Sequence, residues 1–132
     1  MVIDIKKEKD RTTVPKIWGG EDWIANDEDT NYCGKIIRVN KGYQCSLHHH
    51  VKKDETFYLA KGKILMELEQ DGKLESVIMN EGEALHVKPG QKHRFTGLEK
   101  YNEIFEFSTY HEDSDSIRDI IGGKTDISGI LK

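Results

Sequence analysis

The sequence predicts an all-β protein built as an antiparallel sandwich or barrel, and two observations support this fold class. Short runs rich in β-branched and aromatic residues recur along the chain, for example at residues 56–59 and 74–79. Between such runs lie turn signals of Gly, Asn, Asp and Pro, such as Asp71-Gly72 and Pro89-Gly90. Many short strands separated by turns of this kind are typical of two antiparallel sheets.

Strands are expected in order along most of the chain. Residues 32–40 alternate well enough for a strand, in which Lys35, Ile37 and Val39 share one face. Gln70-Asp-Gly-Lys predicts a hairpin, because Asp-Gly supplies the positive φ that a two-residue loop needs. The other expected strands lie at residues 2–5, 55–61, 63–69, 74–79, 84–88, 93–97 and 102–110.

The two ends of the chain carry separate expectations. Residues 2–5 read as an edge strand followed by a charged loop, and short terminal strands of this kind often pair with a neighbouring subunit, which favours a homodimer. Residues 113–121 predict a short C-terminal helix, with Ser114 or Asp115 as the N-cap and Gly122-Gly123 as its stop.

Length and charge limit the classes of protein that are possible. The 132 residues are expected to form a single domain, 1–132, with one core. The 20 basic residues are mixed with 24 acidic ones, which leaves a formal net charge of −4. Nucleic acid is therefore not an expected partner, because its recognition needs a basic surface.

Cysteine usage and hydropathy indicate the compartment. Cys33 and Cys45 are the only cysteines; a disulfide between them is possible by number, but we interpret them as free thiols. The N-terminus shows no secretory leader, because residues 1–5 are followed at once by a charged run. No window approaches the length of a transmembrane helix. We therefore expect a cytoplasmic protein with no membrane partner.

Three histidines and one glutamate form a candidate metal site. His48 and His50 are spaced i, i+2, so in an extended strand both imidazoles lie on one face. Glu55 begins a second strand, and His93 follows the Pro89-Gly90 turn. Three imidazoles and one carboxylate make a mixed N/O ligand set, which suits a divalent transition metal such as Zn, Mn, Fe, Ni or Co.

At these residues the sequence resembles the cupin superfamily. All positions of the first cupin motif are matched, by Gly42, His48, His50, Glu55 and Gly62. The second motif is matched by Gly82, Pro89, Gly90 and His93, but Gly97 stands where asparagine is usual. The resemblance covers roughly residues 34–109 and implies a double-stranded β-helix, or jelly-roll, cupin barrel with the metal near one mouth.

A narrower resemblance concerns the reaction. Residues 16–21 resemble the segment ahead of the barrel in sugar-handling cupins, in particular mannose-6-phosphate isomerase-like proteins. This implies a metal-dependent sugar or sugar-phosphate isomerase of carbohydrate metabolism, in which the metal polarises a carbonyl and a base moves a proton between adjacent carbons. Glu106 is the candidate base. As an acidic residue within an apolar strand, it either faces solvent or points into the barrel.

A basic side chain inside the barrel would indicate a substrate with a phosphate or carboxylate group. Lys35, Arg38 and Lys92 are the candidate contacts for such a small-molecule substrate, although any of them could instead face solvent. Other histidines are expected to be structural or exposed: His49, His86 and His111.

Two other functions share the same four ligands. The first is an iron-dependent dioxygenase, which oxygen uptake with thiol or diketone substrates would reveal. The second is a non-catalytic small-molecule or sugar-binding module, which would hold its metal but turn over no substrate. The fold supports many chemistries, so these alternatives stay open at the level of sequence.

Overall fold

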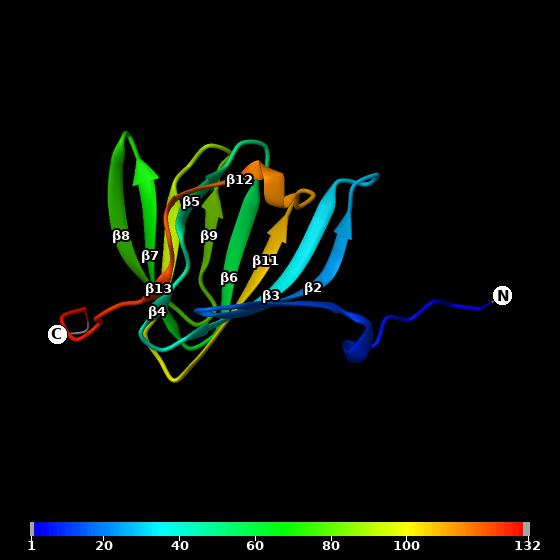
Figure 1. The fold of residues 1–132 in the computed structure, drawn as a ribbon, viewed down its shortest axis with the longest axis horizontal. Helices are drawn as coiled ribbons and strands as arrows, with labels where there is room; N and C mark the ends of the chain where they lie inside the picture. Colours follow the sequence, from blue (N-terminus) through cyan, green and yellow to red (C-terminus); the bar gives the residue numbers. More distant parts are fainter. Residues whose placement is uncertain (1, 131–132) are drawn as a thin grey trace.

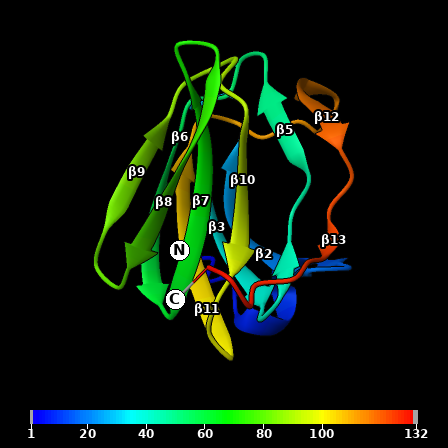
Figure 2. The ribbon, with the colours of Figure 1, turned by 90° about the vertical axis from the view of Figure 1, so that its left-hand side faces the viewer.

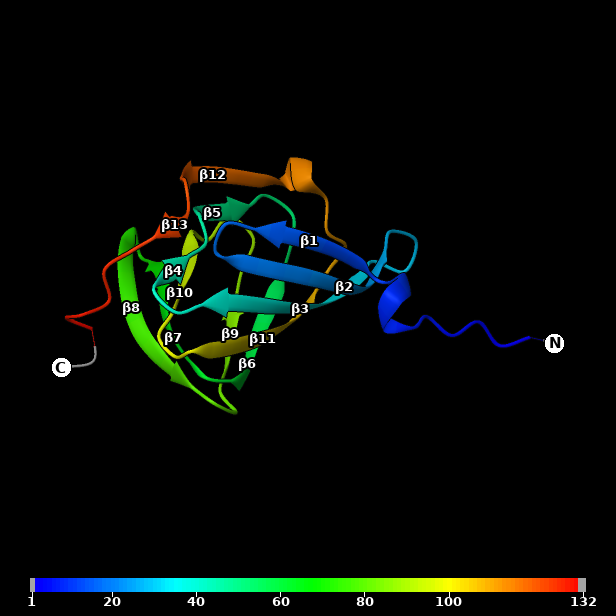
Figure 3. The same cartoon turned by 60° about the horizontal axis from the view of Figure 1, so that its bottom comes forward.

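The computed structural model describes residues 2–130 and shows an all-β fold of two antiparallel sheets (Figure 1). The predicted jelly-roll sandwich is confirmed. The strands of the first sheet lie side by side in Figure 3. In spatial order they are β1 (Thr12–Lys16), β2 (Gly19–Asp27), β3 (Tyr32–Asn40), β11 (Tyr101–Ser108), β6 (Glu55–Lys61) and β9 (Ala84–Val87).

The second sheet faces the first and is seen best in Figure 2. Its central strand, β10, pairs with β7 on one side and with both β4 and β5 on the other. In spatial order its strands are β8 (Lys73–Asn80), β7 (Lys63–Gln70), β10 (His93–Gly97), β5 (Leu47–His50) with β4 (Tyr43–Gln44), and β12 (Ser116–Ile120) with β13 (Gly123–Lys124).

The β7–β8 hairpin forms where the Asp-Gly pair predicts it. Asp71 and Gly72 both have positive φ, of 51° and 78°. This is the left-handed backbone of a two-residue hairpin turn, which glycine and aspartate adopt at low cost. The turn sets the register of eight paired positions, from Lys63↔Asn80 to Gln70↔Lys73.

The hydrophobic core lies between the two sheets, because alternate residues of each strand point inward. In β3 the predicted alternation is observed: Lys35, Ile37 and Val39 are buried together, while Arg38 lies on the opposite face. The largest fully buried apolar side chains are Phe57, Ile37, Leu59, Ile64, Met66, Leu98, Ile104, Val39 and Val87.

The helix expected at residues 113–121 is not formed, and this prediction is wrong. Only one 3₁₀ turn, η2 (Asp113–Asp115), precedes strand β12. Asp115 is buried and accepts hydrogen bonds from the backbone N–H groups of Lys52 and Lys53, at 2.8 and 3.0 Å. A short isolated helix is marginal in water, whereas a strand here satisfies the free edge of β5.

The strand expected at residues 2–5 is also absent. These residues have no regular structure and lead away from the two sheets (Figure 1), followed by the 3₁₀ turn η1 (Glu8–Asp10). The edge strand of the first sheet is instead β1, whose Pro15 fits an edge position because it has no N–H to donate. Pairing of the N-terminus with a neighbouring subunit stays a prediction.

Cys33 and Cys45 are both buried and form no disulfide, as their interpretation as free thiols predicts. Burial raises the pKa of the Cys45 thiol to about 12, so this thiol stays protonated. Within residues 2–130, no helix has the length and apolar character that a membrane crossing requires.

The departure from the cupin motif at Gly97 has a steric explanation. A Cβ atom at Gly97 would lie 2.5 Å from the carbonyl oxygen of Asn40 and 2.8 Å from Nδ2 of Asn102. Asn102 is fully buried, and its amide donates to the carbonyl oxygens of Val39 and Glu99, at 2.9 and 2.8 Å. The amide of Asn102 thus occupies the space that a side chain at position 97 would need.

We therefore expect Gly97→Asn, which restores the usual motif residue, to destabilise this protein by about 1–3 kcal/mol through overpacking. Urea unfolding monitored by fluorescence would measure the change. Gly34→Asn is the matched control, since a Cβ at Gly34 meets no atom within 4 Å. Equal stability of the Gly97 and Gly34 variants would contradict this explanation.

Candidate metal centre

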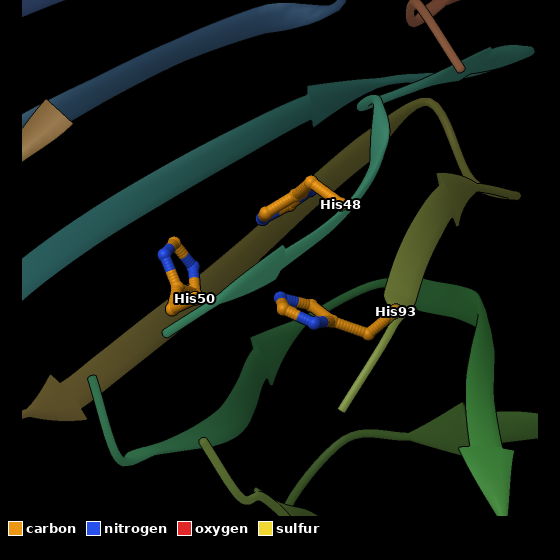
Figure 4. A group of neighbouring side chains, drawn as sticks. All are labelled: His48, His50 and His93. Carbon is orange, nitrogen blue, oxygen red and sulfur yellow. The ribbon is translucent and has the colours of Figure 1, made fainter. Parts of the chain in front are cut away.

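Three histidine side chains from two adjacent strands converge between the sheets (Figure 4). His48 and His50 project from the same face of β5, and His93, at the start of β10, lies directly opposite His48 in the register. One ring nitrogen of each histidine lies within 4.8 Å of the corresponding atoms of the other two. The structure therefore brings together the three histidines that the sequence pattern selects.

Hydrogen bonds orient two of these rings. Nδ1 of His48 lies 2.8 Å from the carbonyl oxygen of Ser46, and Nδ1 of His93 lies 3.0 Å from that of Gln91. A carbonyl oxygen only accepts, so each Nδ1 must carry the proton and donate it. In the neutral ring this tautomer leaves a lone pair on each Nε2, which is the form of imidazole that binds a metal.

The carboxylate of Glu55 completes the cluster. Its Oε2 atom lies 3.2 Å from Nε2 of His50 and 3.3 Å from Nε2 of His93. Both Glu55 Oε2 and His93 Nε2 are buried without a hydrogen-bond partner among the described residues. Two facing electron-pair donors in a buried site repel each other unless a cation lies between them. The four side chains therefore fit a bound metal ion.

The surroundings hold the ligands in the protonation states that a metal needs. Burial lowers the pKa of His48 to about 3, and the nearby rings of His93 and His50 contribute to the shift. Burial alone would raise the pKa of Glu55, but the adjacent rings of His50 and His93 and the ammonium group of Lys53 reverse the effect and hold the pKa well below its usual value. At neutral pH His48 is therefore neutral and Glu55 is ionised.

The cluster borders a cavity of about 700 Å³. This volume is within the range of small-molecule sites in proteins. The apolar part of its wall includes Trp18, Ile37, Phe57 and Phe95. Its polar part includes His48, His50, Glu55, Lys16, Glu21, Lys35, Lys53, Glu106, His111, Asp113, Ser116 and Arg118.

Glu106 points into this cavity and not into solvent, being only 4% exposed. Its Oε2 atom lies 2.6 Å from Nζ of Lys53 and accepts a hydrogen bond from Ser108. Lys53 also lies 3.8 Å from Oε1 of Glu55, so its ammonium group connects the candidate base to the metal cluster. Lys53 was not predicted from the sequence, because no local pattern marks one lysine of a loop as buried.

The three basic residues considered as anion contacts lie in different places. Lys35 lines the cavity, but its Nζ is already 3.0 Å from Oε1 of Glu21. Arg38 lies on the outer face of the first sheet, 3.0 Å from Asp22. Lys92 does not line the cavity and is 42% exposed. Of the three, only Lys35 lines the cavity, and its ammonium group is already paired with the carboxylate of Glu21.

Two further residues of the site were missed at the level of sequence. His111 is buried, and its Nδ1 lies 3.0 Å from Nζ of Lys53. Burial and the charge of Lys53 lower the pKa of His111 to about 4, so the neutral ring accepts a hydrogen bond from the ammonium group. Arg118 lines the cavity from β12. The period of two in a strand over residues 116–120 places Arg118 on the same face as Ser116.

The chain is a two-sheet jelly roll with a histidine cluster and a cavity between its sheets. These features place it in the class of small β-barrel domains that enclose a site for one ligand. The family model described as the cupin domain matches residues 35–100, which is half of the chain. The chain therefore belongs to the cupin domain family. No curated protein sequence matches it significantly.

Solved structures share the fold at low sequence identity. Oxalate decarboxylase from Bacillus subtilis is similar with a TM-score of 0.73 and 19% identity, over 84% of this chain and 30% of that one. KdgF from Halomonas sp. gives a TM-score of 0.63 and 18% identity, over 72% of this chain and 82% of that one. The capsular polysaccharide assembling protein CapF from Staphylococcus aureus gives a TM-score of 0.72 and 14% identity, over 82% of this chain and 34% of that one. The chain thus spans about a third of two of these proteins, and the likeness is one of fold.

Proposed function

We propose that this cupin domain binds one divalent transition metal through His48, His50, Glu55 and His93 and uses it as an enzyme. The observation that carries the proposal is the pair of buried, unpartnered atoms, His93 Nε2 and Glu55 Oε2, which face each other beside the cavity. The ligand set suits Zn, Mn, Fe, Ni or Co. When bound, the metal supplies a Lewis acid that polarises a substrate carbonyl.

We further propose that the reaction is a proton transfer between adjacent carbons of a sugar or sugar phosphate, which amounts to aldose–ketose isomerisation. Glu106 is suited to act as the base. Its Oε2 atom is held by Lys53 and Ser108, whereas the described residues provide no hydrogen bond or ion pair to Oε1. Oε1 is therefore the oxygen that accepts and returns the substrate proton, while Lys53 keeps the carboxylate in place.

The test is incorporation of solvent deuterium into hexoses and hexose phosphates, followed by NMR under anaerobic conditions, with elemental analysis of the same samples. We expect stoichiometric metal in the wild-type protein and in Glu106→Gln, with the exchange rate of the variant lower by about 10²-fold or more. Glu103→Gln is the matched control, because Glu103 lies on the same strand but on its outer face, near Arg38.

Unchanged exchange in Glu106→Gln would remove Glu106 from the mechanism. Oxygen consumption with thiol or diketone substrates, in place of deuterium exchange, would favour the dioxygenase. A filled metal site with neither activity would favour a binding module. The homodimer and the cytoplasmic location stay predictions, which light scattering and cell fractionation would test.

A further inference from the structure

The charged groups that line the cavity are largely paired with one another. Four carboxylates line it, and each is in contact with a nitrogen base that lines or adjoins the same cavity. The pairs are Glu21 with Lys35 at 3.0 Å, Glu106 with Lys53 at 2.6 Å, Glu55 with His50 at 3.2 Å, and Asp113 with His111 at 2.9 Å. Each acidic side chain of the cavity wall thus already has a basic or imidazole partner, and none of these partners is Arg118 or Lys16.

Two basic side chains of the cavity wall have no such partner. Arg118 and Lys16 both line the cavity, and among residues 2–130 neither side chain makes a hydrogen bond or an ion pair within 4 Å of a carboxylate oxygen. They come from different sheets, Arg118 from β12 and Lys16 from the end of β1. The described residues therefore leave both charged groups available to contact an anionic group of a ligand.

The register of β12 on β5 explains why Arg118, although exposed, lies on the side of β12 that borders the cavity. Ser116 lies opposite His50, and Arg118 lies opposite His48, so both share the face of β5 that carries the metal cluster. The Oγ atom of Ser116 lies 3.0 Å from Nδ1 of His50, which shows that this face of β12 meets the site. Asp119 has the opposite orientation, since it contacts His49 on the outer face of β5.

We propose that Arg118, assisted by Lys16, binds an anionic group of the substrate, so that the substrate is a small polyhydroxy compound bearing a carboxylate or a phosphate. This inference rests on the proposed function, because it places the reacting carbonyl at the metal cluster and the anionic group at Arg118. The guanidinium group of arginine binds both anions through two parallel hydrogen bonds. It replaces Lys35, Arg38 and Lys92 as the anion contact expected from the sequence.

Isothermal titration calorimetry of the full, zinc-loaded chain tests the proposal with three probes: glucose, glucuronate and glucose 6-phosphate. We expect the wild-type protein to bind at least one anionic probe more tightly than glucose. Arg118→Gln should weaken anion binding about tenfold or more and leave glucose binding unchanged, and Arg118→Lys should weaken it less. The tighter of the two anionic probes identifies the group as carboxylate or phosphate.

Lys73→Gln is the control, because Lys73 is exposed on the β7–β8 hairpin and does not line the cavity. Thermal melting and zinc content check that each variant is folded and loaded. Anion binding that is unchanged in Arg118→Gln, or no preference of the wild-type protein for either anion over glucose, would overturn the anion site while leaving the metal site standing. If none of Zn, Mn, Fe, Ni and Co binds, the proposed function fails, and the Arg118 dependence measured on the metal-free chain decides the anion site separately.

Discussion

Replacing His48 and His50 together with alanine is expected to abolish metal binding. Both rings project from one face of β5 into the cluster, and their loss leaves only His93 and Glu55. Loss of a single outer hydrogen-bond partner already weakens metal sites by 10–100-fold, so removal of two direct ligands should raise the dissociation constant by about 10³-fold or more. Competition with a chromophoric chelator, together with elemental analysis, would measure the loss.

The double variant should keep its fold, because the paired strands and the apolar core that surround β5 are untouched. Circular dichroism would check this. His49→Ala is the matched control: His49 lies between the two ligands but on the opposite face, where its Nδ1 is 3.4 Å from Asp119. Stoichiometric metal in the double variant, or an equal loss in His49→Ala, would refute the assignment.

Lys53→Met is expected to cause the largest loss of stability. The Lys53 side chain is 2% exposed, and its ammonium group lies 2.6 Å from Glu106 and 3.8 Å from Glu55. Burial alone lowers the pKa of Lys53, but these two carboxylates raise it, so that the net shift is upward and the group stays charged at neutral pH. Removing it leaves two buried carboxylates without their cation, which typically costs about 3–5 kcal/mol.

Urea unfolding of metal-free protein in the presence of a chelator would give the free energy of unfolding. In the double variant Lys53→Met/Glu106→Gln, the second substitution removes one of the two unpaired buried carboxylates. It should therefore recover part of the lost free energy of unfolding. Lys52→Met is the matched control, since the adjacent Lys52 is exposed. A cost for Lys53→Met below about 1 kcal/mol, within the range of surface ion pairs, would show that the Lys53 network is not structurally important.

The histidine cluster could be predicted because its geometry is largely local. An i, i+2 spacing places His48 and His50 on one face of any extended strand, whatever its neighbours are. The turn at Pro89-Gly90 restarts the chain just before His93, which then pairs with β5. The Asp71-Gly72 hairpin belongs to the same kind of inference, since the backbone of a turn depends on its own residues.

The C-terminal segment and Lys53 could not be predicted because they depend on distant partners. Residues 116–120 form a strand since the edge of β5 is there to pair with them, although their local pattern also allows a helix. Lys53 is buried because Glu106, which is 53 positions further on, accepts its charge. The orientation of Arg118 follows from the same pairing with β5.

The amino-acid sequence was sufficient for the fold class, the turns and the four candidate ligands, because strand periodicity and turn chemistry act over a few residues. The charge pairs of the cavity required the folded chain. Whether Glu106, Lys35 or Arg118 faces the cavity, and which of them already has a partner, depends on strand pairing between segments far apart in the chain. Electrostatic interactions depend on distance in space, so only the folded arrangement separates the lysines that neutralise carboxylates from the arginine left for a ligand.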